Sequence, residues 1–152
     1  MKIWVDADAA PQAVKEIVYR AAQRLRIPAA LVANRRLSTP AGNPYVSAVW
    51  VQGGPDVADR HIAEHATAGD VAITADIPLA ADLVDKDVVV LDHRGELLNA
   101  DNVRERLSIR DFMESLRGSG VETGGAAPYS ARDKQAFAGA LDRVLAKAQR
   151  KR

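Results

Sequence analysis

The sequence predicts an α/β domain, a three-layer sandwich with a mostly parallel central sheet. Two observations lead to this prediction: short apolar runs of strand length alternate with segments of helical period, and aspartates stand directly after apolar runs. A chain of 152 residues suits one domain, which we place over 1–152. Sheets of this kind bind their ligands at the carboxyl ends of the strands.

The expected elements follow one another in a regular order. Residues 3–5 form a short buried strand, and Pro11 opens a helix whose apolar residues keep a 3.6-residue period to about Leu25. Ser130 and Asp133 predict a capping box at the start of a last helix, 130–149. The remaining expectations are strands at 29–33, 46–51, 71–74 and 88–91, helices at 55–68, 78–84 and 101–117, a polar loop at 35–44, and a flexible loop or lid at 118–129.

Composition excludes several classes of function. The chain has no cysteine, so it holds no disulfide, thiol nucleophile or thiolate metal site. No apolar run approaches the roughly 20 residues of a membrane span, and the acidic start argues against a signal peptide, so we expect a bacterial cytoplasmic protein. Residues 1–101 carry 10 Lys/Arg against 14 Asp/Glu, whereas residues 102–152 carry 11 against 6. This asymmetry fits a metal-dependent enzyme acting on a polyanion, and it fits equally the charged outer faces of amphipathic helices.

Acidic side chains follow two of the predicted strands. Asp6 and Asp8 come after the first strand and share one face because side chains alternate along a strand. Thr74 and Asp76 follow the strand at 71–74 with the same spacing. The carboxyl ends of neighbouring parallel strands meet at one edge, and carboxylates are ligands for Mg²⁺ or Mn²⁺. The sequence therefore predicts a metal site that includes these acids.

Two more acids lie at the start of the helix predicted over 55–68. Asp59 is a further candidate ligand, whereas Asp56 is explained by its favourable interaction with the helix dipole. A structural explanation also stays open for the strand-end acids, because such aspartates are common in turns and caps. Asp8 in particular could cap the helix that follows it.

Two residues are candidates for binding substrate phosphate. Asn34 stands at the end of the second strand, and Arg94 lies in a turn after the fifth strand, at the edge where the acids should lie. Arg35 and Arg36 also follow a strand end, so they add positive charge near that edge.

Two other motifs compete with this interpretation. His61 and His65 belong to an H-x-x-E-H pattern found in zinc peptidases, but a third ligand is not evident. Asp6 and Asp8 also match the D-x-D of haloacid-dehalogenase-like phosphatases, but the later lysine and acidic pair of those enzymes are not evident at suitable positions.

Several segments in order resemble the YaiI/YqxD family of uncharacterised bacterial proteins (UPF0178). They are WVDADAAP at the start, LVAN at 31–34, GGPDVADRHIAE at 53–64, GDVAITADIPLA at 69–80, HRGELL at 93–98, RERLSIRDFME at 104–114 and GGAAPYSARDKQAFAGALDR at 124–143. The family resembles PIN-like nuclease domains, whose pattern implies roles for Asp6 and for Thr74 and Asp76 here. Members commonly have cysteine where this chain has Ala10, which excludes a thiol mechanism but leaves carboxylate chemistry intact.

The resulting hypothesis is a PIN-like, Mg²⁺- or Mn²⁺-dependent nuclease acting on RNA or single-stranded nucleic acid. Asp6 and Asp76 are its principal metal ligands, Asp8 and Asp59 are second-rank ligands, and Thr74 positions water. The expected partner is nucleic acid, RNA ahead of DNA, with no membrane and with self-association left open. The alternatives are a non-catalytic nucleotide- or RNA-binding protein and a small-molecule phosphohydrolase.

Overall fold

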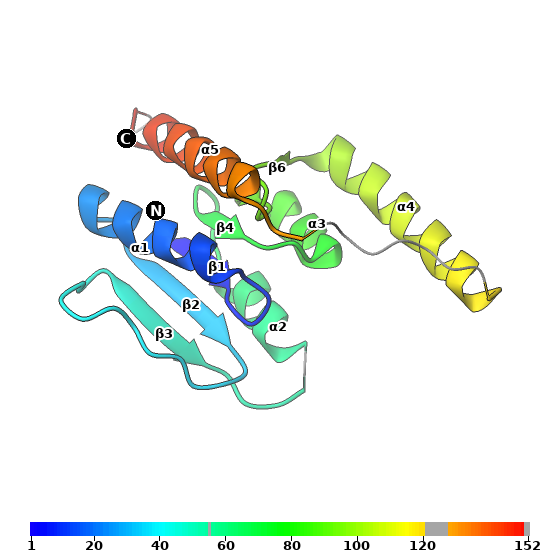
Figure 1. Ribbon diagram of the computed structural model, residues 1–152, viewed down its shortest axis with the longest axis horizontal. Coiled ribbons are helices and arrows are strands. Elements are labelled where there is room, and N and C mark those ends of the chain that lie inside the picture. The colour runs from blue at the N-terminus through cyan, green and yellow to red at the C-terminus, as the bar shows by residue number, and fades with distance from the viewer. Residues whose placement is uncertain (55, 121–127, 151–152) are drawn as a thin grey trace.

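A computed structural model describes residues 1–54, 56–120 and 128–150 of the chain (Figure 1). Six strands and five helices are formed in these ranges. Their bounds are β1 Ile3–Asp6, α1 Gln12–Leu25, β2 Ala29–Ala33, β3 Val46–Trp50, α2 Val57–His65, β4 Val71–Ile73, α3 Ile77–Asp85, β5 Val89–Leu91, β6 Leu97–Leu98, α4 Ala100–Gly118 and α5 Ala131–Arg150.

The strands form one sheet in the order β3-β2-β1-β4-β5-β6. The first five strands pair in parallel, and β6 pairs antiparallel with β5. The predicted α/β class with a mostly parallel sheet is confirmed. The sequence prediction missed β6, because two leucines after a tight turn carry no periodicity of their own.

Helices cover both faces of the sheet, so the molecule has three layers (Figure 1). Along β1, Ile3 and Val5 pack on the side of α1 and α5, whereas Trp4 packs on the side of α2 and α3. The same alternation recurs along β2 and β4, where all side chains are buried. Strands that are covered on both faces are continuously apolar, which explains why short apolar runs located them in the sequence.

Most predicted boundaries agree with the structure to within one or two residues. The helix predicted at 55–68 is shorter, because the chain turns extended at Ala66. The capping box before α5 is confirmed: the Ser130 N–H donates to Asp133 Oδ2 at 2.9 Å, and the Asp133 N–H donates to Ser130 Oγ at 3.2 Å. Of the lid predicted at 118–129, residues 121–127 lie outside the described residues.

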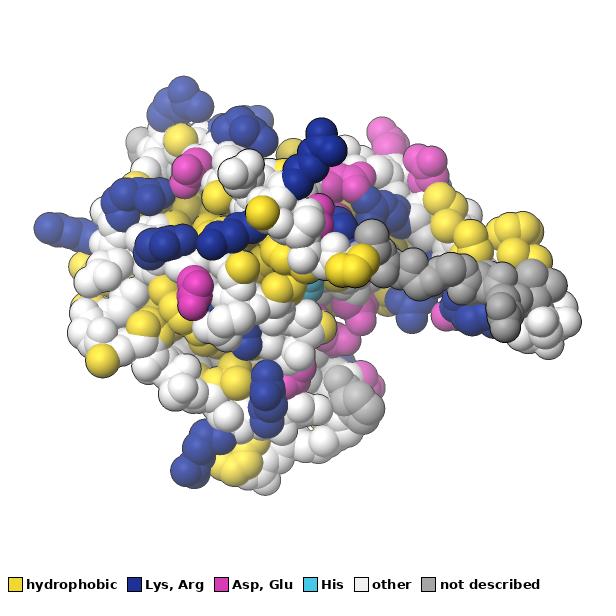
Figure 2. Space-filling model, in the orientation of Figure 1, with side chains coloured by type: hydrophobic (Ala, Val, Ile, Leu, Met, Phe, Trp, Pro, Cys, Tyr) yellow, Lys and Arg dark blue, Asp and Glu magenta, His cyan; other side chains and the backbone are white. Residues whose placement is uncertain are grey.

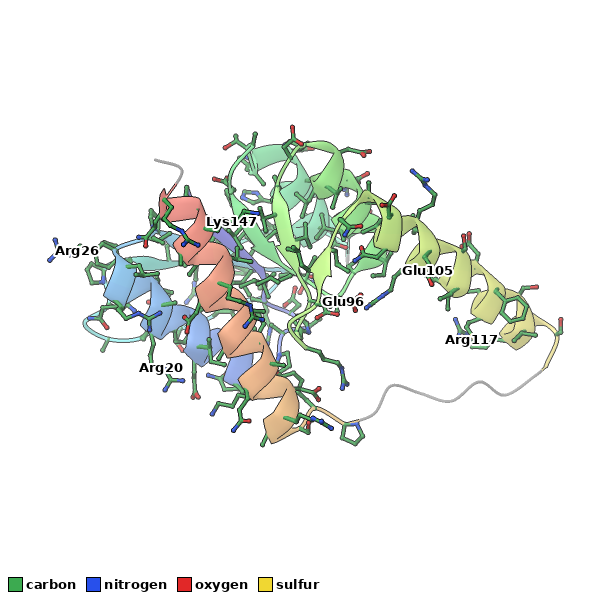
Figure 3. The ribbon with its side chains drawn as sticks, turned by 90° about the horizontal axis from the view of Figure 1, so that it is seen from above. Arg20, Arg26, Glu96, Glu105, Arg117 and Lys147 are labelled. Atoms are coloured by element: carbon green, nitrogen blue, oxygen red, sulfur yellow. The ribbon has the colours of Figure 1, made fainter. Side chains whose placement is uncertain are left out.

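Helix α4 projects from the body of the molecule, with Glu105 and Arg117 along its length (Figure 3). Its outer half presents apolar side chains to solvent, among them Ile109, Phe112 and Met113. None of the described helices is both long and apolar enough to cross a membrane.

The turn between β5 and β6 lies against α5 through Gly95. This residue has a φ of +87°, and a Cβ on it would meet the backbone oxygen of Ala136 at 2.5 Å. Only glycine permits both this backbone conformation and this close approach. The contact therefore holds the carboxyl end of β5 against the start of the last helix.

Substituting Gly95 with alanine should destabilise the protein by about 3 kcal/mol, because strain at positive φ adds to overpacking against the α5 backbone. Gly42 is a matched control, since it also has positive φ but no atom within 4 Å of a Cβ built on it. Gly42→Ala should cost about 1 kcal/mol. Urea unfolding of both variants measures the difference. Equal losses would show that the close approach at Gly95 has no energetic weight.

Candidate functional site

The strand order reverses direction between β1 and β4, which are adjacent in the sheet. From β1 the chain proceeds outward to β2 and β3, and it then returns to β4 on the other side of β1. Such a switch point leaves a crevice outside the carboxyl ends of the two strands, where α/β proteins bind ligands. In this chain β1 ends at Asp6, and Thr74 directly follows β4.

Asp6 and Thr74 meet at this point despite their separation in sequence. The Thr74 hydroxyl donates a hydrogen bond to Asp6 Oδ2 at 3.0 Å. Asp6 is 7% exposed and Thr74 is 1% exposed, so a carboxyl group and its donor are both withdrawn from water. A buried carboxylate is costly unless donors or cations compensate its charge, and Thr74 supplies one donor.

Asp76 has a structural role as well as a place beside Asp6. It is the N-cap of α3, where its Oδ1 accepts a hydrogen bond from the Leu79 N–H at 2.9 Å. Its own N–H donates to Thr74 Oγ1 at 3.0 Å. Thr74 therefore links the two acids, and the cap directs the first turn of α3 at the crevice. Asp76 is therefore a helix cap, as the structural explanation held, and it also lies beside Asp6.

Burial, and after it the charges of neighbouring acids, raises the pKa values of two aspartates at this point. Burial raises the pKa of Asp6, the Thr74 hydroxyl opposes that rise, and the charges of Asp76 and Asp8 add to it. Burial also raises the pKa of Asp59 to about 7, helped by the charges of Asp6 and Asp76 and by a hydrogen bond with Asp76. Near neutral pH, Asp59 therefore holds a proton part of the time and can donate it to the Asp76 carboxylate. We call Asp6, Asp59, Thr74 and Asp76 the switch-point cluster.

Asp8 lies at the margin of this cluster. Its Oδ2 accepts a hydrogen bond from the Asn34 backbone N–H at 2.8 Å, and its Oδ1 lies 3.4 Å from Arg35 Nε. The suggestion that Asp8 caps the following helix is wrong, because the N-cap of α1 is Pro11, with no side-chain cap. Asp8 instead joins the end of β1 to the chain leaving β2. The Asn34 side chain, a predicted phosphate contact, lies at an exposed position beside it.

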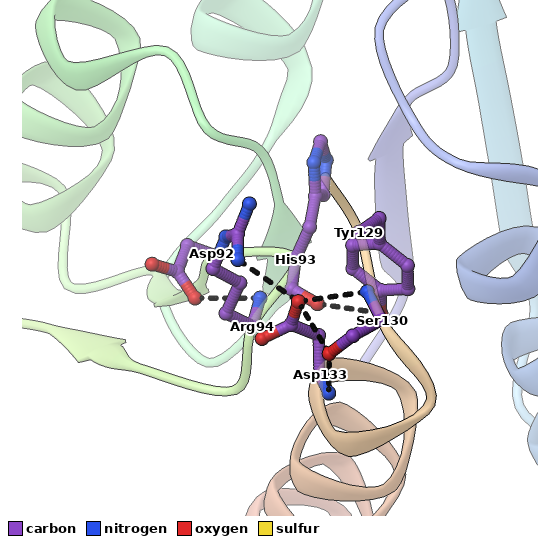
Figure 4. Close-up of polar contacts among 6 residues, drawn as sticks. All are labelled: Asp92, His93, Arg94, Tyr129, Ser130 and Asp133. Carbon is purple, nitrogen blue, oxygen red and sulfur yellow. Dashed lines mark hydrogen bonds and ion pairs between the residues drawn. The ribbon is translucent and has the colours of Figure 1, made fainter. Parts of the chain in front are cut away.

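Arg94 belongs to a polar network that joins the β5–β6 turn to the start of α5 (Figure 4). Its Nη1 lies 2.9 Å from Asp133 Oδ2, and its backbone N–H donates to Asp92 Oδ1 at 2.9 Å. The Tyr129 hydroxyl donates to the backbone oxygen of His93 at 2.8 Å. The predicted role of Arg94 in phosphate binding stays a prediction, and a phosphate would have to compete with Asp133 for its guanidinium.

His93 at the same edge of the sheet was not singled out from the sequence. It follows β5, is 9% exposed, and its Nε2 is buried without a hydrogen-bond partner among the described residues. Burial lowers the pKa of His93, so its ring is neutral at pH 7. The signal that could have found it is its place just after a buried strand, the same signal that located Asp6 and Thr74.

The arrangement of the acids determines how a metal ion could bind. In residues 1–54, 56–120 and 128–150, no three His, Cys, Asp or Glu side chains are grouped so that they could hold a metal ion. The described residues therefore contain no ready-made protein cage. Mg²⁺ commonly uses one or two carboxylates, with water and substrate oxygens completing its shell. The switch-point cluster offers hard oxygen donors of this kind, from the buried Asp6 and the half-buried Asp59 and Asp76.

Among the described residues, no third ligand joins the two histidines of the competing zinc motif. The rings of His61 and His65 stack face to face with centroids 4.0 Å apart, beside the indole of Trp4. The His65 Nδ1 lies 2.8 Å from the backbone oxygen of His61, which occupies one of its ring nitrogens.

Asp56, predicted to be structural, is exposed, and its Oδ2 lies 3.7 Å from Nε of Arg60, four residues later.

Figure 2 shows how charged side chains are distributed over one face of the molecule. Acidic side chains gather in the recess between the body and the projecting α4, whereas Lys and Arg side chains spread over the face of α1 and α5.

The Asp59→Asn variant should be more stable than the wild type at high pH. Because the folded-state pKa of Asp59 is about 7, against 3.8 unperturbed, the folded protein holds an extra proton between these values and loses stability as the pH rises through them. We expect a gain of about 1–2 kcal/mol at pH 8, below the roughly 4 kcal/mol of the full shift, because water screens a partly exposed group.

Urea unfolding at pH 4, 6 and 8 measures this gain, which should vanish at pH 4. Asp82→Asn, at an exposed acid later on α3, is the control and should show no such trend. A variant that is no more stable than wild type at pH 8 would show that Asp59 is not crowded by its neighbours.

Comparisons with known proteins agree with one another. Residues 4–147 match a family model described as "Uncharacterized BCR, YaiI/YqxD family". A "UPF0178 protein" of Myxococcus xanthus is 61% identical over 145 residues, which cover 95% of this chain and 94% of the relative. "UPF0178 protein BAV3236" of Bordetella avium is 57% identical over 147 residues, covering 97% and 95%. These names state a family and no activity, and no solved structure matches. The chain belongs to the YaiI/YqxD family of UPF0178 proteins.

Proposed function

We propose that this protein is a Mg²⁺- or Mn²⁺-dependent nuclease that acts on RNA or single-stranded nucleic acid. The observation that carries the proposal is the meeting of Asp6, Thr74 and Asp76 at the switch point of the sheet, with Asp59 close enough that burial and the charges of Asp6 and Asp76 raise its own pKa to about 7. Crowded, partly buried carboxylates store repulsion that a divalent cation relieves.

Asp6 and Asp76 would hold the cation, with Asp59 and Asp8 beside them. A bound Mg²⁺ or Mn²⁺ would supply positive charge to a phosphate ester and lower the pKa of a water molecule. Thr74 keeps Asp6 oriented through its hydroxyl, and it also receives the Asp76 N–H, so both acids are positioned by one side chain. Asp59 titrates near neutrality and can release its proton when a cation binds.

Charge and topology support nucleic acid as the substrate. Basic residues outnumber acidic ones in residues 102–152, and Lys and Arg side chains spread over the α1 and α5 face (Figure 2). The order β3-β2-β1-β4-β5, with acids after β1 and β4, supports the PIN-like relationship that the sequence resemblance implied. The preference for RNA over DNA rests on that resemblance alone.

Titrating Mn²⁺ into the wild type should give binding heat that Asp6→Asn and the Asp6→Asn/Asp76→Asn double variant lose. Asparagine keeps the capping ability at position 76, so the double variant should remain folded. Asp82→Asn is the control and should bind Mn²⁺ like the wild type. With Mn²⁺ present, the wild type should cleave a single-stranded RNA, and Asp6→Asn should be slower by about 100-fold or more.

The outcomes separate the alternatives. RNA binding with no cleavage in either metal would identify a non-catalytic binding protein. Hydrolysis of a small phosphate monoester in place of RNA would identify a phosphohydrolase. Absence of Mn²⁺ binding, with and without RNA, would overturn the metal-dependent mechanism.

A further inference from the structure

A second candidate site lies beside the switch-point cluster, between α1 and the chain that leaves β2. It is a pocket of about 330 Å³ whose polar lining comes from Gln12, Lys15, Tyr19, Arg35, Ser38 and Thr39. We call it the α1 pocket. The lining contains two cationic side chains, an amide and three hydroxyl groups, and no described acidic residue lines it.

Lys15 is the most unusual of these residues. It is only 8% exposed, although lysine is rarely buried without a counter-charge. In the part of the chain that the structure describes, its ammonium has no hydrogen-bond or ion-pair partner. The Lys15 Nζ is not among the buried unpaired polar atoms, so its stem is buried while the ammonium reaches solvent in the pocket, where an anion would give it a partner.

The other lining groups are donors or add positive potential. Helix α1 begins after Pro11 with no side-chain cap and no acid in its first turn, so its first N–H groups and its dipole favour an anion nearby. Burial, then the charge of Glu16, raises the pKa of the Tyr19 hydroxyl, which therefore stays protonated and able to donate. Ser38 and Thr39 offer two more hydroxyl donors.

Arg35 connects the pocket to the acids. Its Nε lies 3.4 Å from Asp8 Oδ1, and the charge of Asp8 raises the pKa of Asp6 in the cluster. The side chain of Arg35 is 59% exposed, so it can turn from Asp8 toward an anion at little cost. A nucleic-acid strand whose end is bound in the α1 pocket would thus have its next nucleotides near the switch-point cluster.

We propose that the α1 pocket binds the terminal phosphate monoester of a nucleic-acid strand, with Lys15 and Arg35 as its charged ligands. The inference rests on the proposed function for the identity of the strand. A terminal phosphate carries nearly two negative charges at pH 7, which matches two cations, whereas an internal diester carries one. The volume admits a phosphate with part of its nucleotide.

Binding of short single-stranded RNAs, measured without divalent metal, tests this. The oligonucleotides carry a 5′-phosphate, a 3′-phosphate or no terminal phosphate. The wild type should bind one phosphorylated strand more tightly than the unphosphorylated strand. Lys15→Met, which keeps the buried stem, and Arg35→Gln should each weaken that binding about tenfold or more. Arg20→Gln is the matched control, because Arg20 is exposed on the same helix and points away from the body (Figure 3).

Unchanged binding in both variants would overturn the proposal. An equal loss on all three strands would assign the pocket to internal phosphates and overturn the terminal assignment. If Lys15→Met fails to fold, the exposed Arg35→Gln alone decides. Asp6→Asn should retain the preference for a phosphorylated strand while it loses cleavage, so the two proposals can fail separately. If the wild type cleaves RNA but shows no preference for a terminal phosphate, the proposal for the α1 pocket is wrong. If it shows that preference but cleaves no RNA, the proposed nuclease activity is wrong.

Discussion

The burial of the Asp6 carboxyl group at the end of β1 is the constraint on which the rest of this site depends. Thr74 compensates part of the cost by donating its hydroxyl, and this single contact binds the ends of two strands that are 68 residues apart in sequence. The same hydroxyl receives the Asp76 N–H, so the start of α3 is aligned on the buried acid. Asp59 then approaches from α2, where burial, together with the charges of Asp6 and Asp76, raises its pKa to about 7. Without the Asp6 carboxyl group, the Thr74 hydroxyl would lose its acceptor, and Asp59 would lose one of the charges that raise its pKa.

Negatively and then positively charged side chains follow one another in space along the carboxyl edge of the sheet. Acids stand at the switch point, Asp8 lies at their margin, and Arg35 links Asp8 to the α1 pocket with its buried Lys15. The first region has carboxylates in excess, and the second is lined by two cations, of which Arg35 is paired with Asp8 and Lys15 has no ion-pair partner among the described residues. A metal ion would balance the negative charge of the first region, and a phosphate would balance the positive charge of the second. A phosphate ester in contact with a metal cation would supply both charges together.

The far end of the edge is held by contacts between the β5–β6 turn and α5. Gly95 permits the backbones to touch, and the hydrogen bonds of Asp92, Tyr129 and Asp133 fix the turn around His93 (Figure 4). The C-terminal helix therefore helps to shape an edge that is built from N-terminal strands. Arg94, which looked free to bind phosphate when only its place in a turn was known, is engaged in this scaffold through Asp133.

The apolar runs and helical periods of the sequence by themselves determined the α/β class, the bounds of most elements and the acids after β1 and β4, because strands covered on both faces must be apolar and must end where polar residues begin. Tertiary structure alone decided which strand ends are neighbours, since pairing of β1 with β4 is a property of the sheet order. It also decided that Asp59 joins Asp6 and Asp76, that Asp8 braces β2 and does not cap α1, and that Lys15 is buried. Such facts depend on distances between segments far apart in the chain, and local periodicity carries no information about those distances.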